Sequence, residues 1–522
     1  MSFTWKGALQ ELQDRRSRAR ELGGARRIAR AHEQGRYTIR ERIERSTTSF
    51  TEIGELACYE DVDATGQSLD TLPSSYVCGL AEFAGRTVAL GGEDFTVRGG
   101  APTSYLGRMK GGLGGFVEDL AHEYRIPLVM FLEGIGGDVA AQAEKGYAYL
   151  ASSVSMQRPI ELLSQVPVLG MISGAAVGAT AGRAVLTHFS VMTKDSVLFA
   201  GGPPLVRRAL GIDVDKHELG GGALHTGVSG AIDNLAEDED DAIRQMQTVL
   251  SYLPQNVWEM PPRGERSDPV DRRAEELLDI IPEERRRPYR VDKMIRAVVD
   301  NDSFFQVGPK WGRSLVTGFA RMDGIPVGVI ANNPGVLGGA IDAKAAEKQI
   351  RFVDTCSTFH LPIVYFVDVP GFMVGPDAER SSTIRWGMRA VQSLAEAEVP
   401  VVTVQVRKAF GMAVNATSNP DRLGLRLAWP SGEWGDLPVE GGVEAGFRRE
   451  IEAAEDPVAY RRLVEERMLG LSDPFKTAEH FGVEQMIDPR ETREVVCRFL
   501  EASLHRVRTS LGPSQRQWRP RP

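Results

Sequence analysis

The feature that most constrains the fold of this chain is an internal repeat. Val166–Gly182 (VPVLGMISGAAVGATAG) in the first half matches Val399–Thr417 (VPVVTVQVRKAFGMAVNAT) in the second. In both copies 11 residues separate a proline from a glycine, Pro167 from Gly178 and Pro400 from Gly411. A repeat of this length predicts two copies of one structural unit rather than a single large domain.

A second matched pair lies upstream in each half. Arg125–Gly137 (RIPLVMFLEGIGG) matches His360–Phe372 (HLPIVYFVDVPGF), and each is an apolar run that ends in glycine. Such runs are typical of strands buried on both faces, and helical stretches lie between them, so the sequence predicts an α/β layered fold. Two matched glycine turns favour an enzyme that stabilises two oxyanions, one on each of two reactants.

Composition limits the class of protein. At 522 residues with 42% hydrophobic content, the chain can bury two domain-sized cores, and its net charge of −9 argues against nucleic-acid binding. The four cysteines are scattered without the spacing of a metal site, so we expect reduced thiols and no metal. The N-terminus lacks the apolar core of a signal peptide, and no apolar run reaches about 18 residues. We therefore expect a soluble, cytoplasmic protein without a membrane segment.

Changes in composition divide the chain into five segments. Between about Glu237 and Val298 the composition turns charged, with the runs EDEDDAIRQ, PPRGERSDPVDRRAEE and IPEERRRPYR, which indicates an inter-domain linker. The expected segments are a helical N-terminal part (1–45), a first half (46–260), a charged linker (261–298), a second half (299–510) and a tail (511–522).

The glycine turns are the candidate functional sites. A glycine-rich turn between a buried strand and a helix lets backbone N–H groups point at a ligand, and the helix N-terminus adds partial positive charge. The candidate donors are Gly178 and Ala179 in the first half, and Gly411, Met412 and Ala413 in the second. Loss of one such donor costs about 3 kcal/mol in a transition state. The alternative is a close helix–strand contact that requires small residues.

No side chain is a clear nucleophile or general base. The chain has neither a GxSxG nor an HExxH motif, and its eight histidines are dispersed. His225, between two glycine-rich turns in LGGGALHTGVSG, is the histidine of most interest. The absence of a base favours chemistry in which a substrate or cofactor carries its own base.

Long blocks of the chain resemble the carboxyltransferase (β) subunits of biotin-dependent acyl-CoA carboxylases, of the propionyl-CoA and methylcrotonyl-CoA carboxylase type within the crotonase superfamily. The resemblance spans about residues 35–510 and implies two tandem crotonase-like halves, each a ClpP/crotonase ββα spiral. The blocks that carry it are EDFTVRGG (Glu93–Gly100), LFAGGPPLVRRALG (Leu198–Gly211), HELGGGALHTGVSG (His217–Gly230), ANNPGVLGGAIDAKAAEKQIRFVDTC (Ala331–Cys356), VDVPGFMVG (Val367–Gly375) and RKAFGMA (Arg407–Ala413).

The resemblance implies a reaction and a role for each turn. In that family the carboxyl group moves from carboxybiotin to the enolate of an acyl-CoA, and the released biotin is thought to take the substrate proton. The Gly178 and Ala179 amides would hold the thioester enolate in an acyl-CoA-binding first half. The Met412 and Ala413 amides, at the turn begun by Gly411, would hold the biotin ureido oxygen in the second half.

The resemblance also implies partners. A biotin carboxylase and a biotin carrier would be separate chains, because nothing here resembles an ATP-grasp domain or a biotinyl-lysine motif. The active site would lie between the first half of one protomer and the second half of another, so a homo-oligomer built from dimers, commonly a hexamer, is expected. Biotin on its carrier and a coenzyme A thioester are the expected cofactor and substrate, with no metal.

The chain departs from the family pattern at both turns. The first turn is usually Gly-Gly and here is Gly178-Ala179, and the second is usually Gly-Gly-Ala and here has Met412 between Gly411 and Ala413. An amide survives either change, but the added side chain restricts φ and narrows the approach. Val139 also lies near the position of a family arginine.

These departures leave three functional hypotheses open. The first is a carboxyltransferase subunit for an unusual acyl-CoA, with features of both the propionyl-type and methylcrotonyl-type branches. The second is a biotin-independent carboxyacyl-CoA decarboxylase, motivated by Met412, and the third is a non-catalytic subunit of a mixed complex. Asn415 falls at a position that helps to set acyl selectivity in propionyl-type relatives. Arg98, Arg108 and Lys110 are candidates for CoA phosphates or for a solvated surface.

Overall fold

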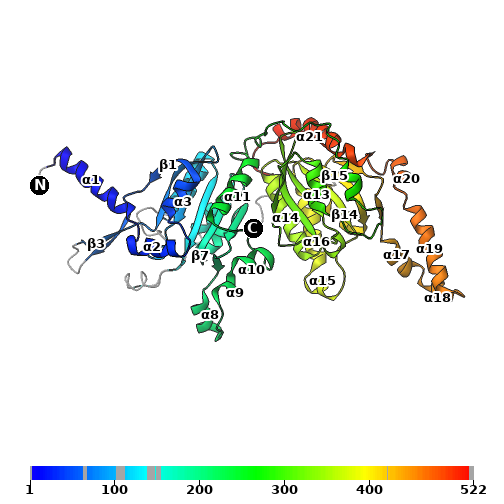
Figure 1. The fold of residues 1–522 in the computed structure, drawn as a ribbon, viewed down its shortest axis with the longest axis horizontal. Helices are drawn as coiled ribbons and strands as arrows, with labels where there is room; N and C mark the ends of the chain where they lie inside the picture. The colour runs from blue at the N-terminus through cyan, green and yellow to red at the C-terminus, as the bar shows by residue number, and fades with distance from the viewer. Residues whose placement is uncertain are drawn as a thin grey trace. The chain divides into compact units, whose positions relative to one another are not determined.

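The structure, a computed structural model, describes residues 3–62, 68–101, 112–137, 147, 154–419 and 421–515. It divides into two compact units at the bond between Glu259 and Met260. Each unit contains one eight-stranded sheet with helices packed on it (Figure 1). The α/β fold expected from the sequence is therefore confirmed, with one copy of the repeat in each unit.

The first sheet has the order β1-β4-β5-β6-β7-β8-β10, and β9 pairs with β7 beyond this path. A separate ribbon is formed by β2 and β3. The strands of this unit are β1 (Thr47–Ile53), β2 (Cys58–Val62), β3 (Ser68–Pro73), β4 (Tyr76–Phe83), β5 (Arg86–Glu93), β6 (Leu128–Gly134), β7 (Val168–Val177), β8 (Phe189–Thr193), β9 (Val197–Phe199) and β10 (Asn234–Ala236).

The second sheet repeats this topology, with the order β11-β12-β13-β14-β15-β16-β18 and with β17 paired to β15. Its strands are β11 (Phe305–Val307), β12 (Leu315–Met322), β13 (Ile325–Asn332), β14 (Ile363–Val369), β15 (Val401–Phe410), β16 (Leu425–Ala428), β17 (Glu433–Gly435) and β18 (Gln485–Met486).

The strand registers match as closely as the strand orders. In the first sheet β6 and β7 are parallel, and their register shifts just before the pair Gly134 and Ala176. In the second sheet β14 and β15 are parallel, and their register shifts just before the pair Val369 and Ala409. The two copies therefore place the carboxyl end of their central strand, β7 or β15, in the same local geometry.

Helices flank both sheets. Those of the first unit are α1 (Trp5–Arg20), α2 (Ala25–Glu33), α3 (Ile39–Ser46), α4 (Gly112–Tyr124), α6 (Val154–Leu162), α7 (Ala179–Val185), α8 (Pro203–Leu210), α9 (Lys216–Gly220), α10 (Gly222–Gly227) and α11 (Glu239–Tyr252). Those of the second are α12 (Glu276–Ile280), α13 (Val291–Val298), η1 (Leu337–Gly339), α14 (Ala343–Thr358), α15 (Pro376–Arg380), α16 (Thr383–Glu396), η2 (Gly411–Ala416), α17 (Val439–Gly446), α18 (Arg448–Ala453), α19 (Pro457–Leu471), α20 (Pro474–Glu479), η3 (Pro489–Glu491) and α21 (Thr492–Arg508). No helix in these described ranges is long and apolar enough to cross a membrane.

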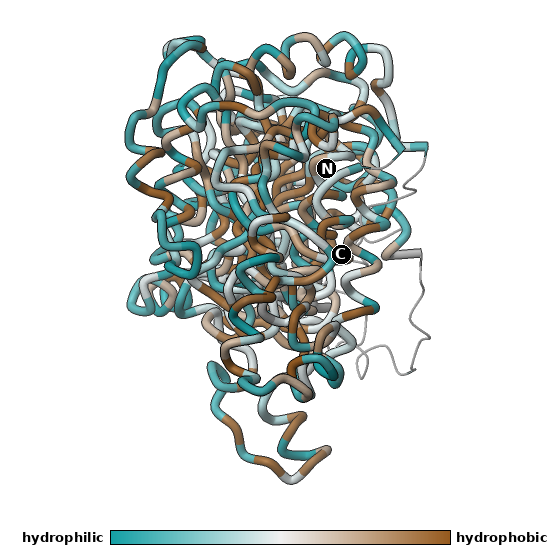
Figure 2. The backbone as a smooth tube through the Cα atoms, turned by 90° about the vertical axis from the view of Figure 1, so that its right-hand side faces the viewer, coloured by the Kyte–Doolittle hydropathy of each residue, from teal (hydrophilic) through white to brown (hydrophobic). Residues whose placement is uncertain are grey.

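Each unit has its own hydrophobic core between sheet and helices. Buried hydrophobic side chains form a large cluster in each unit. In Figure 2 many of the outer loops are teal, the colour of hydrophilic residues. Central strands such as β6 and β14 are buried along their whole length, which explains why the sequence shows them as unbroken apolar runs. Burial on both faces holds the ends of these strands, and with them the glycine turns, in fixed positions.

The segment expected to be a charged linker, residues 261–298, belongs to the second unit instead. Its helices α12 and α13 bury Leu277, Met294 and Ile295 in the core of that unit. The part of the chain from Met260 onward therefore folds as one body, and the expected linker is corrected to an integral N-terminal part of the second half.

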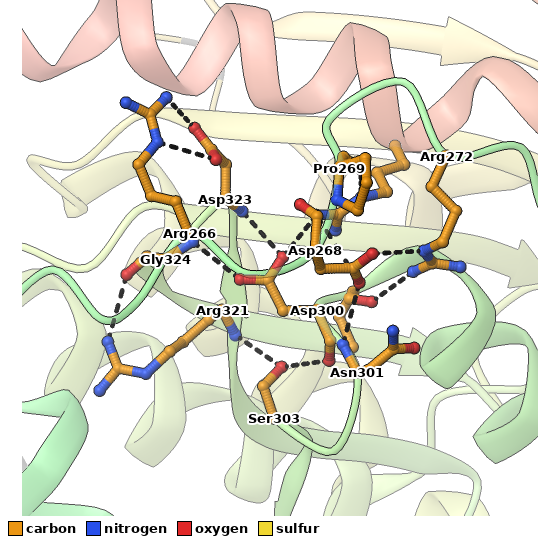
Figure 3. A network of polar contacts seen from close by, with 12 residues as sticks. Arg266, Asp268, Pro269, Arg272, Asp300, Asn301, Ser303, Arg321, Asp323 and Gly324 are labelled. Atoms are coloured by element: carbon orange, nitrogen blue, oxygen red, sulfur yellow. Dashed lines mark hydrogen bonds and ion pairs between the residues drawn. The ribbon is translucent and has the colours of Figure 1, made fainter.

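The charges that suggested a solvated linker are paired within the second unit (Figure 3). Arg272 Nε donates to Asp268 Oδ1 at 2.8 Å, and Arg266 Nε donates to Asp323 Oδ1 at 2.9 Å in the turn between β12 and β13. The partner of Arg266 lies 57 residues away and therefore gives no local pattern, so composition alone cannot separate such a network from a linker. The remaining domain boundaries stay predictions.

Candidate functional site

The first glycine turn joins β7 to α7. Gly178 has φ of 60° and ψ of −118°, a conformation in which a side chain is strained, and α7 begins at Ala179. The Gly178 N–H donates to the carbonyl oxygen of Phe199 in β9 at 3.3 Å, so this amide already has a partner within the sheet. Ala179 is exposed and is the first residue of α7, where no intrahelical acceptor exists for its N–H.

The loop after β6 packs directly against this turn. A Cβ added at Gly136 would lie 2.6 Å from the carbonyl oxygen of Val177, and one added at Gly178 would lie 3.7 Å from the Gly136 Cα. Only glycine fits at position 136, because its φ is 78° and the facing backbone leaves no room. Two loops from neighbouring parallel strands thus meet at the exposed Ala179 amide.

The second glycine turn joins β15 to the short 3-10 helix η2. Gly411 has φ of 62°, close to the value at Gly178, and a Cβ there would lie 3.1 Å from the carbonyl oxygen of Asp436. Met412 is 56% exposed, whereas Ala413 is fully buried. Asn415 is exposed on the same short helix. Of the two expected donors, the Met412 amide is therefore on the accessible residue.

A cavity of about 680 Å³ lies in the first unit beside the carboxyl end of β7. One wall is small and apolar, with Ala175, Val197 and Phe199 close to the first glycine turn. The lining also carries six basic side chains from α2, α3, α9 and their flanking loops, namely Arg27, Arg30, Arg36, Arg42, Lys216 and His217. Three carboxylates, Asp94, Glu133 and Asp195, line the cavity as well. The cavity is suited to a ligand with an apolar arm and several negative charges.

Each unit has a buried carboxylate near the carboxyl end of the strand that pairs with the central strand and precedes it in the sequence. Glu133 of β6 pairs with Arg42, with 2.7 Å between Oε2 and Nη2, and also contacts Arg36. Asp368 of β14 pairs with Arg407, with 3.1 Å between Oδ2 and Nη2. Sequence reasoning missed both pairs, although Glu133 and Asp368 occupy equivalent places in the aligned strands.

Glu93, at the end of β5, is a second buried carboxyl group near the first turn. Its Oε2 accepts a hydrogen bond from the Glu133 N–H at 3.3 Å. Burial raises the pKa of Glu93 to about 7, and the nearby Arg183 of α7 opposes that shift. Arg183 itself donates to Glu118 of α4 at 2.7 Å. One buried carboxyl group near the first turn, Glu93, thus has a pKa of about 7.

Other residues singled out in the sequence have structural positions. His225 Nε2 donates to the Leu198 carbonyl oxygen at 2.7 Å, and its Nδ1 lies 2.9 Å from the Ser229 hydroxyl, so this side chain ties α10 to β9. The Arg98 guanidinium lies 5.0 Å from the centroid of the Tyr59 ring. Arg108, Lys110 and Val139 lie outside the described residues. Within the described ranges, no three His, Cys, Asp or Glu residues form a group that could hold a metal ion.

Two matched α/β units, each with a glycine turn at the end of its central strand, define the tandem crotonase-like class. Comparison with known families agrees, because the carboxyl transferase domain matches residues 30–518. The chain belongs to the carboxyl transferase family. This membership confirms the family, the tandem crotonase-like fold and the expected kind of enzyme, a carboxyltransferase that acts on an acyl-CoA.

Individual relatives are similar over nearly their whole length. The carboxyltransferase subunit of propionyl-CoA carboxylase from Haloferax mediterranei is 35% identical over 94% of this chain and 95% of its own. The alpha subunit of methylmalonyl-CoA decarboxylase from Veillonella parvula is 32% identical over 97% of both chains. The crystal structure of transcarboxylase 12S, a hexamer with methylmalonyl-CoA bound, superposes with a TM-score of 0.88 at 31% identity and covers 99% of each chain.

Proposed function

We propose that this chain is the carboxyltransferase subunit of an acyl-CoA carboxylase, which moves a carboxyl group from carboxybiotin to the enolate of an acyl-CoA. The observation that carries the proposal is the pair of matched turns, in which Gly178 and Gly411 each precede an exposed residue, Ala179 or Met412. One anion-stabilising turn per unit fits a reaction with two oxyanions on two different reactants.

The first unit would bind the acyl-CoA. Its cavity offers Arg30, Lys216 and His217 to the phosphates of coenzyme A, and the apolar wall at Phe199 to the pantetheine arm. The Ala179 amide, at the N-terminus of α7, would donate to the thioester oxygen as negative charge develops on it. Because the Gly178 amide donates to the Phe199 carbonyl oxygen, Gly178 would shape the turn and the Ala179 N–H would donate to the thioester oxygen.

The second unit would receive the biotin. The turn at Gly411 fits a ureido oxygen because the accessible Met412 carries a backbone N–H there, and the Met412 side chain can cover an apolar ring system. Carboxybiotin, when a carrier protein delivers it, supplies the activated carboxyl group. The chain itself contributes the hydrogen-bond donors and the exclusion of water at both reactants.

The partners follow from the same proposal. A biotin carboxylase and a biotin carrier protein would load the carboxyl group, and we propose a homo-oligomer, in line with the hexamer described for transcarboxylase 12S. The relatives include subunits of propionyl-CoA carboxylase and of methylmalonyl-CoA decarboxylase, so short branched or straight acyl groups are the first substrates to test. A cytoplasmic location also stays a prediction.

Decarboxylation of a carboxyacyl-CoA without biotin is the second candidate. Met412 at the biotin-side turn motivates it. The first unit would still stabilise the same enolate, because loss of CO2 from a malonyl-type thioester passes through that anion. Only the role of the second turn differs between the two candidates.

One experiment separates these candidates. Purified chain is assayed against a panel of acyl-CoAs with and without a biotin carboxylase and carrier pair, and against the matching carboxyacyl-CoAs with no biotin protein present. Carboxylation that requires the pair supports the proposed function. Release of CO2 without biotin supports the second candidate, and no turnover by the homo-oligomer in either arm supports a non-catalytic partner subunit.

A further inference from the structure

The two halves share a buried carboxylate at one equivalent position. Glu133 and Asp368 each precede the residue at which the register shifts, Gly134 in β6 and Val369 in β14. Glu133 is 2% exposed and Asp368 is 1% exposed. A charge so deeply buried needs a cation close by, because an unpaired buried charge is strongly destabilising.

In the first half two cations reach Glu133, Arg42 from a helix and Arg36 from the loop before that helix. Arg42, on α3 and 1% exposed, reaches Glu133 through Nη2 and donates through Nε to Glu239 Oε2 at 2.7 Å. The strand beside Glu133 leaves space for this arrangement at Gly174 of β7. A Cβ there would lie 2.0 Å from Glu133 Oε1, so the carboxylate occupies the place of a side chain.

In the second half the cation comes from the strand. Arg407 of β15 pairs with Asp368 through Nη2 at 3.1 Å and donates through Nη1 to the Arg287 carbonyl oxygen at 2.9 Å. Its guanidinium carbon lies 5.1 Å from the centroid of the Tyr289 ring, a cation–π contact that holds it in place. The pair is enclosed, since Arg407 is 2% exposed.

The two halves have therefore exchanged the element that carries the arginine. Gly174 and Arg407 occupy the same place in the repeat, seven residues after the matched prolines. Arg42 and Met294 also correspond, because each is the fourth residue of an eight-residue helix that precedes the first strand of its sheet. The first half has arginine on the helix and glycine on the strand, and the second has methionine on the helix and arginine on the strand.

Both halves have a buried carboxylate paired with an arginine. The backbone contacts of Asp368 indicate what this pair does in the second half. Asp368 Oδ1 accepts the N–H of Lys408 at 3.1 Å, three residues before Gly411. One carboxylate thus contacts both the side chain of Arg407 and the backbone of the strand that enters the second turn. Arg407 Nη2 lies 3.1 Å from the second oxygen of that carboxylate, an ion pair without hydrogen-bond geometry that neutralises the buried charge.

We propose that Asp368 and Arg407 are positioning residues for the second glycine turn, and that they hold the backbone N–H of Met412 in the direction that the transferred group requires. The inference rests on the proposed function for its catalytic consequence, but the positioning itself is a property of the chain alone. Glu133 and Arg42 form the corresponding pair beneath the first turn.

The test compares two buried arginines of the second unit. Arg407→Met removes the pair with Asp368, and Arg493→Met is the matched control. Arg493 is also 2% exposed and pairs with Asp300 at 2.7 Å, in the network that anchors residues 266–272 to α21. Both variants lose a buried ion pair, but only the first lies next to the turn.

The first readout is hydrogen exchange of the full chain, followed in peptides that cover residues 408–416. Arg407→Met should raise exchange at the second turn at least about tenfold, because local opening becomes easier when its support is lost. Arg493→Met should leave these peptides unchanged relative to wild type. Equal exchange in the two variants, or protection at the turn that matches wild type in Arg407→Met, overturns the inference.

The second readout is carboxyl transfer in the assembled enzyme. Arg407→Met should lower kcat about 100-fold, the typical cost of misplacing a reacting group by about 1 Å, with the KM for acyl-CoA unchanged. Wild-type kcat in a folded Arg407→Met enzyme overturns the inference. If wild type itself transfers no carboxyl group, the proposed function fails while the exchange data still decide the positioning.

A double variant keeps the inference testable even if Arg407→Met does not fold. Met294→Arg combined with Arg407→Gly gives the second half the arrangement of the first, with arginine on the helix and glycine on the strand. The double variant should recover exchange protection at the turn and at least about a tenth of wild-type kcat, well above Arg407→Gly alone. Equal values for the double and single variants count against pairing as the retained feature.

Discussion

Gly178 and Gly411 both have a positive φ, of 60° and 62°, at the carboxyl ends of equivalent strands. In each case the strand passes directly into a helix, and the residue after the glycine is exposed. Neither the pair Gly178-Ala179 nor the pair Gly411-Met412 has an acidic or basic side chain. Any hydrogen bond that these two positions offer to a ligand therefore comes from the backbone, and a substitution can change it only through φ or through loss of the N–H.

Replacement of Ala179 by proline tests the first turn directly. Proline is tolerated at the first position of a helix and lacks an N–H, so Ala179→Pro removes the proposed donor and retains α7. We expect kcat to fall about 100- to 1,000-fold, as for loss of one oxyanion donor. Steady-state kinetics with a saturating carboxylated carrier measures the effect.

Ala179→Gly is the control for this experiment. It keeps the amide and produces the Gly-Gly turn usual in the family, so activity should be retained. Circular dichroism and thermal unfolding establish that both variants fold. An Ala179→Pro enzyme that is folded and has the kcat of Ala179→Gly removes the Ala179 amide from the mechanism.

Met412 should affect access of a ligand to the second turn. Because its side chain is 56% exposed, Met412→Gly should cost only about 1 kcal/mol of stability, the usual helix penalty of glycine. We expect it to change the KM for the carboxylated carrier and to leave the KM for acyl-CoA as in wild type. A change confined to acyl-CoA would place Met412 on the other reactant.

Asn415 should influence the choice of acyl group. It is exposed on η2, three residues beyond Met412, where a larger or charged side chain can be introduced without disturbing the core. Asn415→Ile and Asn415→Asp should shift the preference among acyl chain lengths, as measured by kcat/KM across an acyl-CoA panel. If the relative kcat/KM values match those of wild type, Asn415 has no part in selectivity.

Glu93 should make stability fall as pH rises. Burial raises its pKa from 4.5 to about 7, so the folded protein retains a proton that the unfolded chain has released. The contribution of Glu93 to the free energy of unfolding therefore decreases between pH ~4.5 and ~7 and is constant above that range. Glu93→Gln removes this dependence and should stabilise the protein by about 3 kcal/mol at neutral pH.

Denaturant unfolding followed at several pH values measures this effect. The wild-type and Glu93→Gln curves should coincide near pH 4 and diverge up to about pH 7. The glutamine can still accept the Glu133 N–H, so the hydrogen bond at 3.3 Å is preserved in the variant. A constant difference between the two proteins across this range would show that Glu93 titrates normally.

The sequence repeat was sufficient to predict the duplicated α/β fold and the place of both turns. Buried parallel strands show as unbroken apolar runs in the sequence. A turn that requires positive φ shows as a glycine at the same place in both copies, because few other residues adopt that conformation. The aligned spacing from Pro167 to Gly178 and from Pro400 to Gly411 thus located equivalent strand ends. The fit of each turn to its ligand stays a prediction.

Long-range charge pairing could not be predicted in this way. Arg493 donates to the Asp268 carbonyl oxygen across 225 residues of sequence, so the charged run around Asp268 looked solvated and was assigned to a linker. Glu133 and Asp368 were overlooked for a related reason, since their arginines come from different elements in the two halves. The matched carboxylates themselves were visible in the aligned strands and could have indicated a buried pair.

The buried arginine lies on a helix in the first half and on a strand in the second. A single segment of one half therefore cannot replace its counterpart in the other half without disturbing the ion pair. Copying β7 over β15 alone would place glycine at position 407 and leave Asp368 an unpaired anion, and copying α3 over α13 alone would bring a second guanidinium group towards Asp368. Either recombination event is destabilising unless helix and strand move together. For one half to take the arrangement of the other, its helix and its strand must therefore change together.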